Sequence, residues 1–256
     1  MSAPPAPRRT GLDGGCYVLG PDDLAWTGGD AWREAPLVDR AGGAAALSQY
    51  RVRVAAGRSP CRSYPGSDAA LFVLRGAGSL GIGGRAFEIG PDTGAFVKAG
   101  EAFEIAVAGA GPLELLVGVC PECPAPRRHD AMPDRFDAAH PQRTVRAAER
   151  ARHAMGDRFY QVLVGDEIGS MQVTQFIGFI PQSRAPEHYH HYEEAITVLS
   201  GTGRLWTGAR SAPVGPGSAI FLPRRQPHAL ECTDPAGLRL VGLFYPAGSP
   251  AANYPA

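Results

Sequence analysis

The segment His188-Tyr189-His190-His191-Tyr192-Glu193-Glu194 decides how the rest of the chain is interpreted. It contains the pattern His-x-His-x-x-x-Glu, and a fourth candidate, His228, follows in Pro223-x-Arg225-x-x-His228. Alternate residues of a β-strand share a face, so His188, His190 and Glu194 are expected to project together, with His228 joining them from a neighbouring strand. Three imidazoles and one carboxylate suit a divalent transition metal and leave one or two coordination positions open.

The same alternation sends two other residues of the segment to the opposite face. His191 and Glu193 have the wrong parity for the metal, and we expect His191 and Tyr192 to serve in outer-face packing or a domain contact. A lone histidine would be interpreted as an ordinary polar residue without a metal role. Four candidate ligands at these spacings favour a metal site.

The surrounding residues carry a family resemblance. The segment from Pro186 to Gly203, with Gly201-Thr202-Gly203 at its end, resembles the first cupin motif, and the segment from Gly217 to His228 resembles the second, Gly-x5-Pro-x-Gly-x2-His. Arg225 stands where the family has its turn glycine. The resemblance implies a six- to eight-stranded antiparallel barrel with the metal inside, and frequent dimers.

An internal repeat extends this interpretation to the first half of the chain. Shifting the numbering by 125 aligns the segment from Ser63 to Ile105 with that from His188 to Leu230 without a gap, and the matched residues include Gly76/Gly201, Gly78/Gly203, Gly83/Gly208 and Gly90/Gly215. Matched glycines mark turns that need positive φ or close approach. The repeat predicts two tandem copies of one barrel.

The first copy lacks every candidate ligand. Ser63, Pro65, Ala69 and Phe103 stand at the positions of His188, His190, Glu194 and His228. We therefore expect a single metal site in the C-terminal copy, and a first copy that is structural or binds something apolar near Phe103.

The predicted fold class is all-β: two tandem antiparallel β-barrels of the jelly-roll cupin type, a bicupin, joined by a short helical linker. The expected domains are a disordered tail (1–15), an N-terminal barrel without metal ligands (16–122), a linker (123–158) and a C-terminal metal-binding barrel (159–256). The linker helix is expected between Thr144 and Met155, with Thr144 as N-cap.

Composition limits the partners. The 256 residues carry no formal net charge, which offers no basic excess for nucleic acid and no polybasic run for a membrane surface. No apolar run approaches the roughly 18 to 20 residues that span a bilayer. Five scattered cysteines without a secretory signal fit reduced thiols in the cytoplasm. The expected partner is a small-molecule substrate, with a homodimer as a further expectation.

The ligand set alone does not choose the metal or the reaction. We favour Fe or Mn, and Zn, Ni, Co and Cu also fit imidazole and carboxylate ligands. An oxygenase of the dioxygenase type is the leading prediction, with Glu194 as a ligand or as a catalytic base. The alternatives are a non-redox isomerase, lyase or hydrolase, and a non-catalytic binding protein. Ureidoglycine aminohydrolases are similar in architecture as bicupins with a C-terminal metal.

Two further polar residues are candidates near the expected mouth of the barrel. Gln175 lies on a strand that leads to the motif and is a candidate to support the ligands. Arg184 lies four residues before His188 and is a candidate to hold a substrate carboxylate. For each, the alternative is an ordinary surface or strand position.

Overall fold

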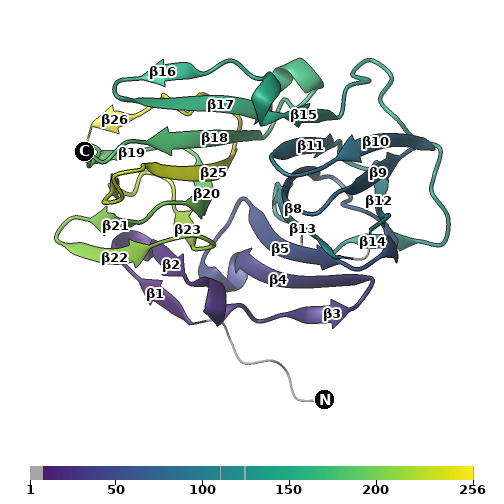
Figure 1. The fold of residues 1–256 in the computed structure, drawn as a ribbon, viewed down its shortest axis with the longest axis horizontal. Coiled ribbons are helices and arrows are strands. Elements are labelled where there is room, and N and C mark those ends of the chain that lie inside the picture. The colour runs from purple at the N-terminus through teal and green to yellow at the C-terminus, as the bar shows by residue number, and fades with distance from the viewer. Residues whose placement is uncertain (1–7, 110, 124, 256) are drawn as a thin grey trace.

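The computed structural model describes residues 8–109, 111–123 and 125–255, and Figure 1 shows two β-rich halves side by side. Within these ranges there is no α-helix. The helical segments are single 3-10 turns at Asp13–Gly15, Pro21–Asp23, Arg40–Gly42, Ala147–Glu149 and Asp166–Ile168. None of them is long and apolar enough to cross a membrane. The all-β prediction is confirmed.

Two antiparallel sheets form the first half. The larger runs in the order β15 (Thr144–Arg146), β11 (Thr93–Val97), β8 (Asp68–Arg75), β13 (Leu113–Cys120), β5 (Ser48–Val54), β4 (Trp32–Val38), β3 (Thr27–Gly29). The smaller runs β10 (Arg85–Ile89), β9 (Gly78–Ile82), β12 (Ala102–Val107), β7 (Cys61–Ser63), β14 (Arg127–His129), with β6 (Gly57–Arg58) on β12. Phe103 is fully buried between them against Trp32 and Tyr64.

The second half repeats this plan. Its large sheet runs β1 (Arg9–Gly11), β2 (Tyr17–Leu19), β23 (Ala219–Leu222), β20 (Glu193–Ser200), β25 (Leu238–Tyr245), β18 (Thr174–Ile180), β17 (Arg158–Val164), β16 (His153–Met155). The smaller sheet runs β22 (Arg210–Val214), β21 (Gly203–Thr207), β24 (Ala229–Cys232), and a short pair joins β19 (His188–Tyr189) to β26 (Tyr254–Pro255). Each half is thus a jelly-roll of facing sheets, without a continuous ladder closing a barrel.

The strands recur at the spacing of the sequence repeat. β8, β9, β10 and β13 shift by 125 residues onto β20, β21, β22 and β25. The order β11-β8-β13-β5-β4 of the first large sheet matches β23-β20-β25-β18-β17 of the second.

The two halves exchange edge strands. β2 precedes the first half in the chain but pairs with β23 of the second, Tyr17 opposite Phe221. β15 precedes the second half but pairs with β11 of the first, Val145 opposite Gly94. An edge strand offers unpaired N–H and C=O groups, and the exchange covers both edges.

The large sheets also pack back to back. Along β8, Leu71 belongs to the core of its own half, whereas Ala70 and Phe72 belong to the shared core between the halves. This explains why these strands are continuously apolar. The approach is close at Gly118 on β13, because a Cβ there would lie 2.0 Å from Cδ2 of Leu243.

Two local predictions are wrong. The expected helix between Thr144 and Met155 is instead β15, one 3-10 turn and β16, because pairing with β11 and burial of Val145 override helix propensity. The expected disordered tail begins outside the described residues at 1–7, but β1 at Arg9–Gly11 pairs with β2, and Arg9 forms an ion pair with Asp39 at 2.8 Å.

Candidate metal centre

Three histidines meet at one end of the second half. The backbones of His188 and His228 pair directly: His188 N–H donates to the His228 carbonyl at 3.0 Å, and His228 N–H donates back at 2.9 Å. His190 follows β19, and its ring centroid lies 4.9 Å from that of His188 and 5.1 Å from that of His228. One ring nitrogen of each lies within 4.8 Å of the others, so this group could hold a metal ion.

All three imidazoles are oriented by backbone carbonyls. Nδ1 of His188 lies 2.9 Å from the Pro186 oxygen, Nδ1 of His190 lies 3.1 Å from the Ala252 oxygen, and Nδ1 of His228 lies 2.9 Å from the Gln226 oxygen. A carbonyl oxygen only accepts hydrogen bonds, so each Nδ1 donates. This tautomer leaves the Nε2 lone pair of each ring free for a ligand.

Burial keeps these rings neutral. Desolvation lowers the pKa of His190 to about 4 and that of His228 to about 3. The pKa of His188 is also lowered, by burial first and then by the charge of Arg158. Only the neutral imidazole can bind a metal ion, so the rings stand in the competent form at neutral pH.

Glu194 enters the same pocket from β20. Its carboxylate is buried, and Oε2 lies 3.7 Å from Nε2 of His190. Burial raises the pKa of Glu194 to about 8. Gly242 on the adjacent β25 makes room, since a Cβ there would lie 3.2 Å from Oε1 of Glu194 and 2.3 Å from the Phe176 ring. Glu194 therefore borders the three-histidine group.

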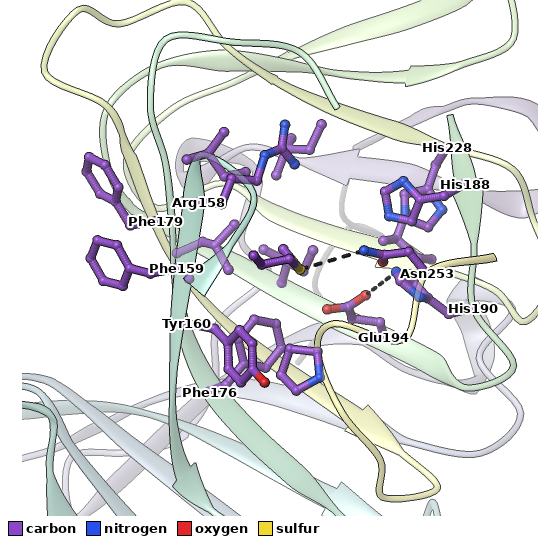
Figure 2. Close-up of a pocket in the computed structure, with 18 of the residues that line it drawn as sticks. Arg158, Phe159, Tyr160, Phe176, Phe179, His188, His190, Glu194, His228 and Asn253 are labelled. Carbon is purple, nitrogen blue, oxygen red and sulfur yellow. Dashed lines mark hydrogen bonds and ion pairs between the residues drawn. The ribbon is translucent and has the colours of Figure 1, made fainter. Parts of the chain in front are cut away.

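A cavity of about 90 Å³ is bordered by the three histidines and Glu194. Figure 2 shows the histidines on one side and aromatic rings on the other. The remaining walls are mainly apolar side chains of β17, β18, β20, β21, β23, β24 and β25: Phe159, Tyr160, Phe176, Phe179, Ile180, Ile196, Leu205, Leu222, Leu230 and Leu240. A small organic molecule with limited polarity matches such walls.

One cation lines this cavity. Arg158, at the start of β17, lies across the pocket from the histidines in Figure 2, and only 12% of its side chain is exposed. Burial lowers its pKa, which the nearby Asp157 partly offsets. Sequence inspection missed this residue, because Arg158 is distant in sequence from both motifs and no motif marks it.

The last residues of the described chain run across the site. Pro250 and Asn253 line the cavity, and Asn253 lies 3.6 Å from the sulfur of Met155. Tyr254 on β26 stacks on Tyr189 with centroids 5.5 Å apart. Sequence reasoning missed this C-terminal strap (residues 246–255), whose local composition offers no metal-related signal.

Neither of the two additional candidates lies in the cavity. Gln175 is buried on β18, but its neighbour Phe176 faces the pocket, so alternation turns Gln175 toward the other half, where Oε1 would lie 3.0 Å from a Cβ at Gly94. Arg184 stacks over the Trp206 ring at 4.2 Å and is absent from the cavity lining. These positions do not support the predicted roles.

Glu193 performs a different task from its neighbour. Its carboxylate accepts hydrogen bonds from the backbone N–H groups of Ala45, at 3.0 Å, and Ala46, at 2.7 Å. The parity argument correctly places it away from the cavity, and its contact links the two halves.

Arg225 keeps the turn that the glycine of the second motif would make. Its φ is 61°, in the left-handed region, and its N–H donates to the His190 carbonyl at 2.7 Å. Arg225 thus adopts a backbone conformation that usually favours glycine. The turn fixes His190 from the segment that carries His228.

Comparison with known proteins supports the cupin superfamily. Residues 175–244 match the Cupin_2 family model, described as a cupin domain. That segment contains the three histidines and Glu194. A shorter match is to the HTH-type transcriptional activator RhaS of Klebsiella pneumoniae, 35% identical over 68 residues. This match covers 27% of the present chain and 24% of that protein, so the chain matches only about a quarter of its curated relative.

Solved structures share the fold over nearly the whole chain. A mutant of Bacillus subtilis oxalate decarboxylase superposes with a TM-score of 0.74 at 12% identity, over 90% of this chain and 77% of that one. The putative glyoxylate induced protein of Pseudomonas aeruginosa gives 0.74 at 19% identity, over 96% and 97%. Protein Ylba of E. coli gives 0.72 at 16% identity, over 95% and 96%. At these identities the likeness is one of fold.

Proposed function

We propose that this chain is a bicupin metalloenzyme that acts on a small organic molecule in its C-terminal half. The observation that carries the proposal is the set of three carbonyl-oriented, neutral imidazoles with free Nε2 atoms, bordered by a buried carboxylate and a cavity. His188, His190, His228 and Glu194 are the proposed ligands. The first half, where Phe103 fills the corresponding interior, acts as a structural partner.

The donor set fits a divalent transition ion. We favour Fe or Mn, while the same nitrogen and oxygen ligands accept Zn, Ni, Co or Cu. Such an ion would supply a Lewis acid with an open position, and with Fe or Mn also a meeting point for O2 and substrate.

The residues around the centre have separate tasks. Apolar walls exclude water and hold a compact carbon skeleton against the histidines. Glu194 lies close enough to His190 to complete the ligand set and to accept a proton from a substrate in the cavity. An oxygenase that cleaves enolisable or catecholic compounds is our leading proposal, because such substrates combine an apolar carbon skeleton with a hydroxyl group that can reach the metal.

A non-redox lyase, isomerase or hydrolase is the second proposal. Arg158 favours it, because a cation in the cavity suits a charged substrate, and one structural neighbour is named as an oxalate decarboxylase. A non-catalytic sensor is the third, supported by the short match to a transcriptional activator. The described residues contain no α-helix for a DNA-binding helix pair.

Elemental analysis of purified protein followed by oxygen-uptake assays separates these proposals. Anaerobically metallated protein should consume O2 with at least one compound from a panel of enolisable and catecholic substrates. Absence of uptake across the panel would count heavily against an oxygenase. If the Zn-loaded protein converts a substrate at the full rate, the enzyme is a lyase, isomerase or hydrolase, because Zn has no redox chemistry.

A further inference from the structure

Only 12% of the Arg158 side chain is exposed, and its guanidinium has no close anionic partner. Its one recorded ion pair joins Nε to Oδ1 of Asp157 at 3.6 Å, beyond a good hydrogen bond, and 59% of the Asp157 side chain is exposed. Among the described residues the Arg158 side chain donates no hydrogen bond. Burying a charge that is poorly paired is costly, so a guanidinium in this position is suited to an anion that arrives from outside.

The position of Arg158 points to the cavity. It lines the same cavity as the three histidines. No other arginine or lysine contributes to this lining among the described residues. Figure 2 shows Arg158 on the opposite side of the cavity from the three imidazoles.

We propose that Arg158 binds the carboxylate of a small substrate and thereby orients its other end toward His188, His190 and His228. This inference rests on the proposed function. A planar guanidinium presents two parallel N–H groups to a carboxylate, which fixes direction as well as charge. The apolar side chains of Phe176, Ile180 and Leu240 then border the carbon skeleton. The substrate class is a compact carboxylic acid with a hydroxyl or carbonyl group at the far end.

The selectivity for a carboxylate can be measured without turnover. Calorimetric titrations with glycolate, lactate and benzoate, and with their uncharged amides, are compared for the unsubstituted protein, Arg158→Gln and Arg158→Lys, each in metallated and metal-free form. Arg158→Gln should weaken carboxylate binding about 10- to 100-fold, the range for a charge-assisted contact. Arg158→Lys should retain part of the affinity, since it keeps the charge but loses the fork.

Arg184→Gln is the matched control. It removes the same charge from the same half, but Arg184 packs on Trp206 outside the cavity, so carboxylate affinity should stay unchanged. Inorganic phosphate serves as a second anion, and binding stronger than that of every carboxylate would overturn the assignment. Equal affinity for acids and amides, no binding of any acid, or an unaltered affinity in Arg158→Gln would overturn it as well.

The metal state separates this inference from the proposed enzyme. Metal content is measured in every variant, and Arg158→Gln should retain the metal of the unsubstituted protein. Arg158-dependent carboxylate binding to a protein that takes up no metal would uphold the anion site and contradict the metalloenzyme. Normal metal uptake with carboxylate binding that does not depend on Arg158 would contradict the anion site and leave the metalloenzyme standing.

Discussion

Nδ1 of His190 donates a hydrogen bond to the carbonyl oxygen of Ala252, 3.1 Å away and 62 residues later in the chain. The contact fixes the ring orientation and tautomer of a proposed ligand by means of the C-terminal strap. The two other histidines receive the same support locally, from carbonyls only two residues before each ring. Of the three histidines, His190 is thus the one whose ring nitrogen is held by a carbonyl distant in sequence.

Deleting residues 252–256 should therefore weaken metal binding. Loss of a supporting hydrogen bond to a ligand typically costs about 10- to 100-fold in metal affinity, and opening the strap exposes the cavity. Equilibrium dialysis against a chelator series measures the change. A shorter deletion of residues 254–256 keeps the Ala252 carbonyl and should cost less. Equal affinities of both truncated proteins and the intact chain would contradict this role.

Replacing single histidines should remove the metal without unfolding the first half. His190→Ala and His228→Ala each delete one of three converging nitrogens, and most bound metal should be lost by elemental analysis. His191→Ala is the control, because its ring packs on Tyr254 and does not line the cavity. Stoichiometric metal in both of the first two variants would refute the ligand set.

The adjacent carboxylates Glu193 and Glu194 should respond in opposite ways to the same substitution. Glu194→Gln should lower metal affinity and change stability little, since Glu194 faces the cavity. Glu193→Gln should keep the metal and lower the free energy of unfolding by about 1 to 3 kcal/mol, because Glu193 accepts backbone hydrogen bonds from Ala45 and Ala46. Denaturant unfolding and dialysis on both variants test this, and an exchange of the two phenotypes would contradict the assigned orientations.

Glu114 should make stability depend on acid. It is fully buried on β13 and accepts a hydrogen bond from Nε of Arg75 at 2.6 Å, with Arg51 and Arg53 nearby. Burial alone raises the pKa of Glu114, but the three guanidinium groups outweigh burial and hold the pKa below its ordinary value. The stabilisation is present above the unfolded-state pKa, about 4.3, and is lost as pH falls through the lower folded value.

Glu114→Gln should therefore destabilise the protein by about 1 to 3 kcal/mol at neutral pH, and the difference should shrink in acid. Urea unfolding at a series of pH values measures it. Glu88→Gln is the control, because 92% of the Glu88 side chain is exposed and its pair with Arg146 is long, at 3.7 Å. A difference between Glu114→Gln and the unsubstituted protein that stays constant from neutral to acid pH would contradict the account.

Much of the fold was predictable because repetition and alternation are local signals. The shift of 125 residues identifies β20 as the equivalent of β8 and β25 as the equivalent of β13, without knowledge of their contacts. The linker was not predictable in this way. Arg143 is buried and donates to both Glu101 oxygens at 2.8 Å, which fastens the linker to the first half through a pair 42 residues apart. Such a contact overrides the propensity that suggested a helix.

The spacing of His188, His190, Glu194 and His228 predicts that they lie close together. The backbone reaches this arrangement differently from the single continuous strand that alternation assumes. The strand does not run continuously through the segment: β19 ends at Tyr189 and β20 begins at Glu193, in a different sheet. The three histidines and Glu194 line one cavity, and the bend between the strands brings Glu194 to the edge of the imidazole group. Arg158 and Ala252 reach the site only through strand pairing and the C-terminal strap. Alternation within a strand predicts which side chains share a face. It does not predict which distant segments pack against that face, because their separation in sequence follows no period.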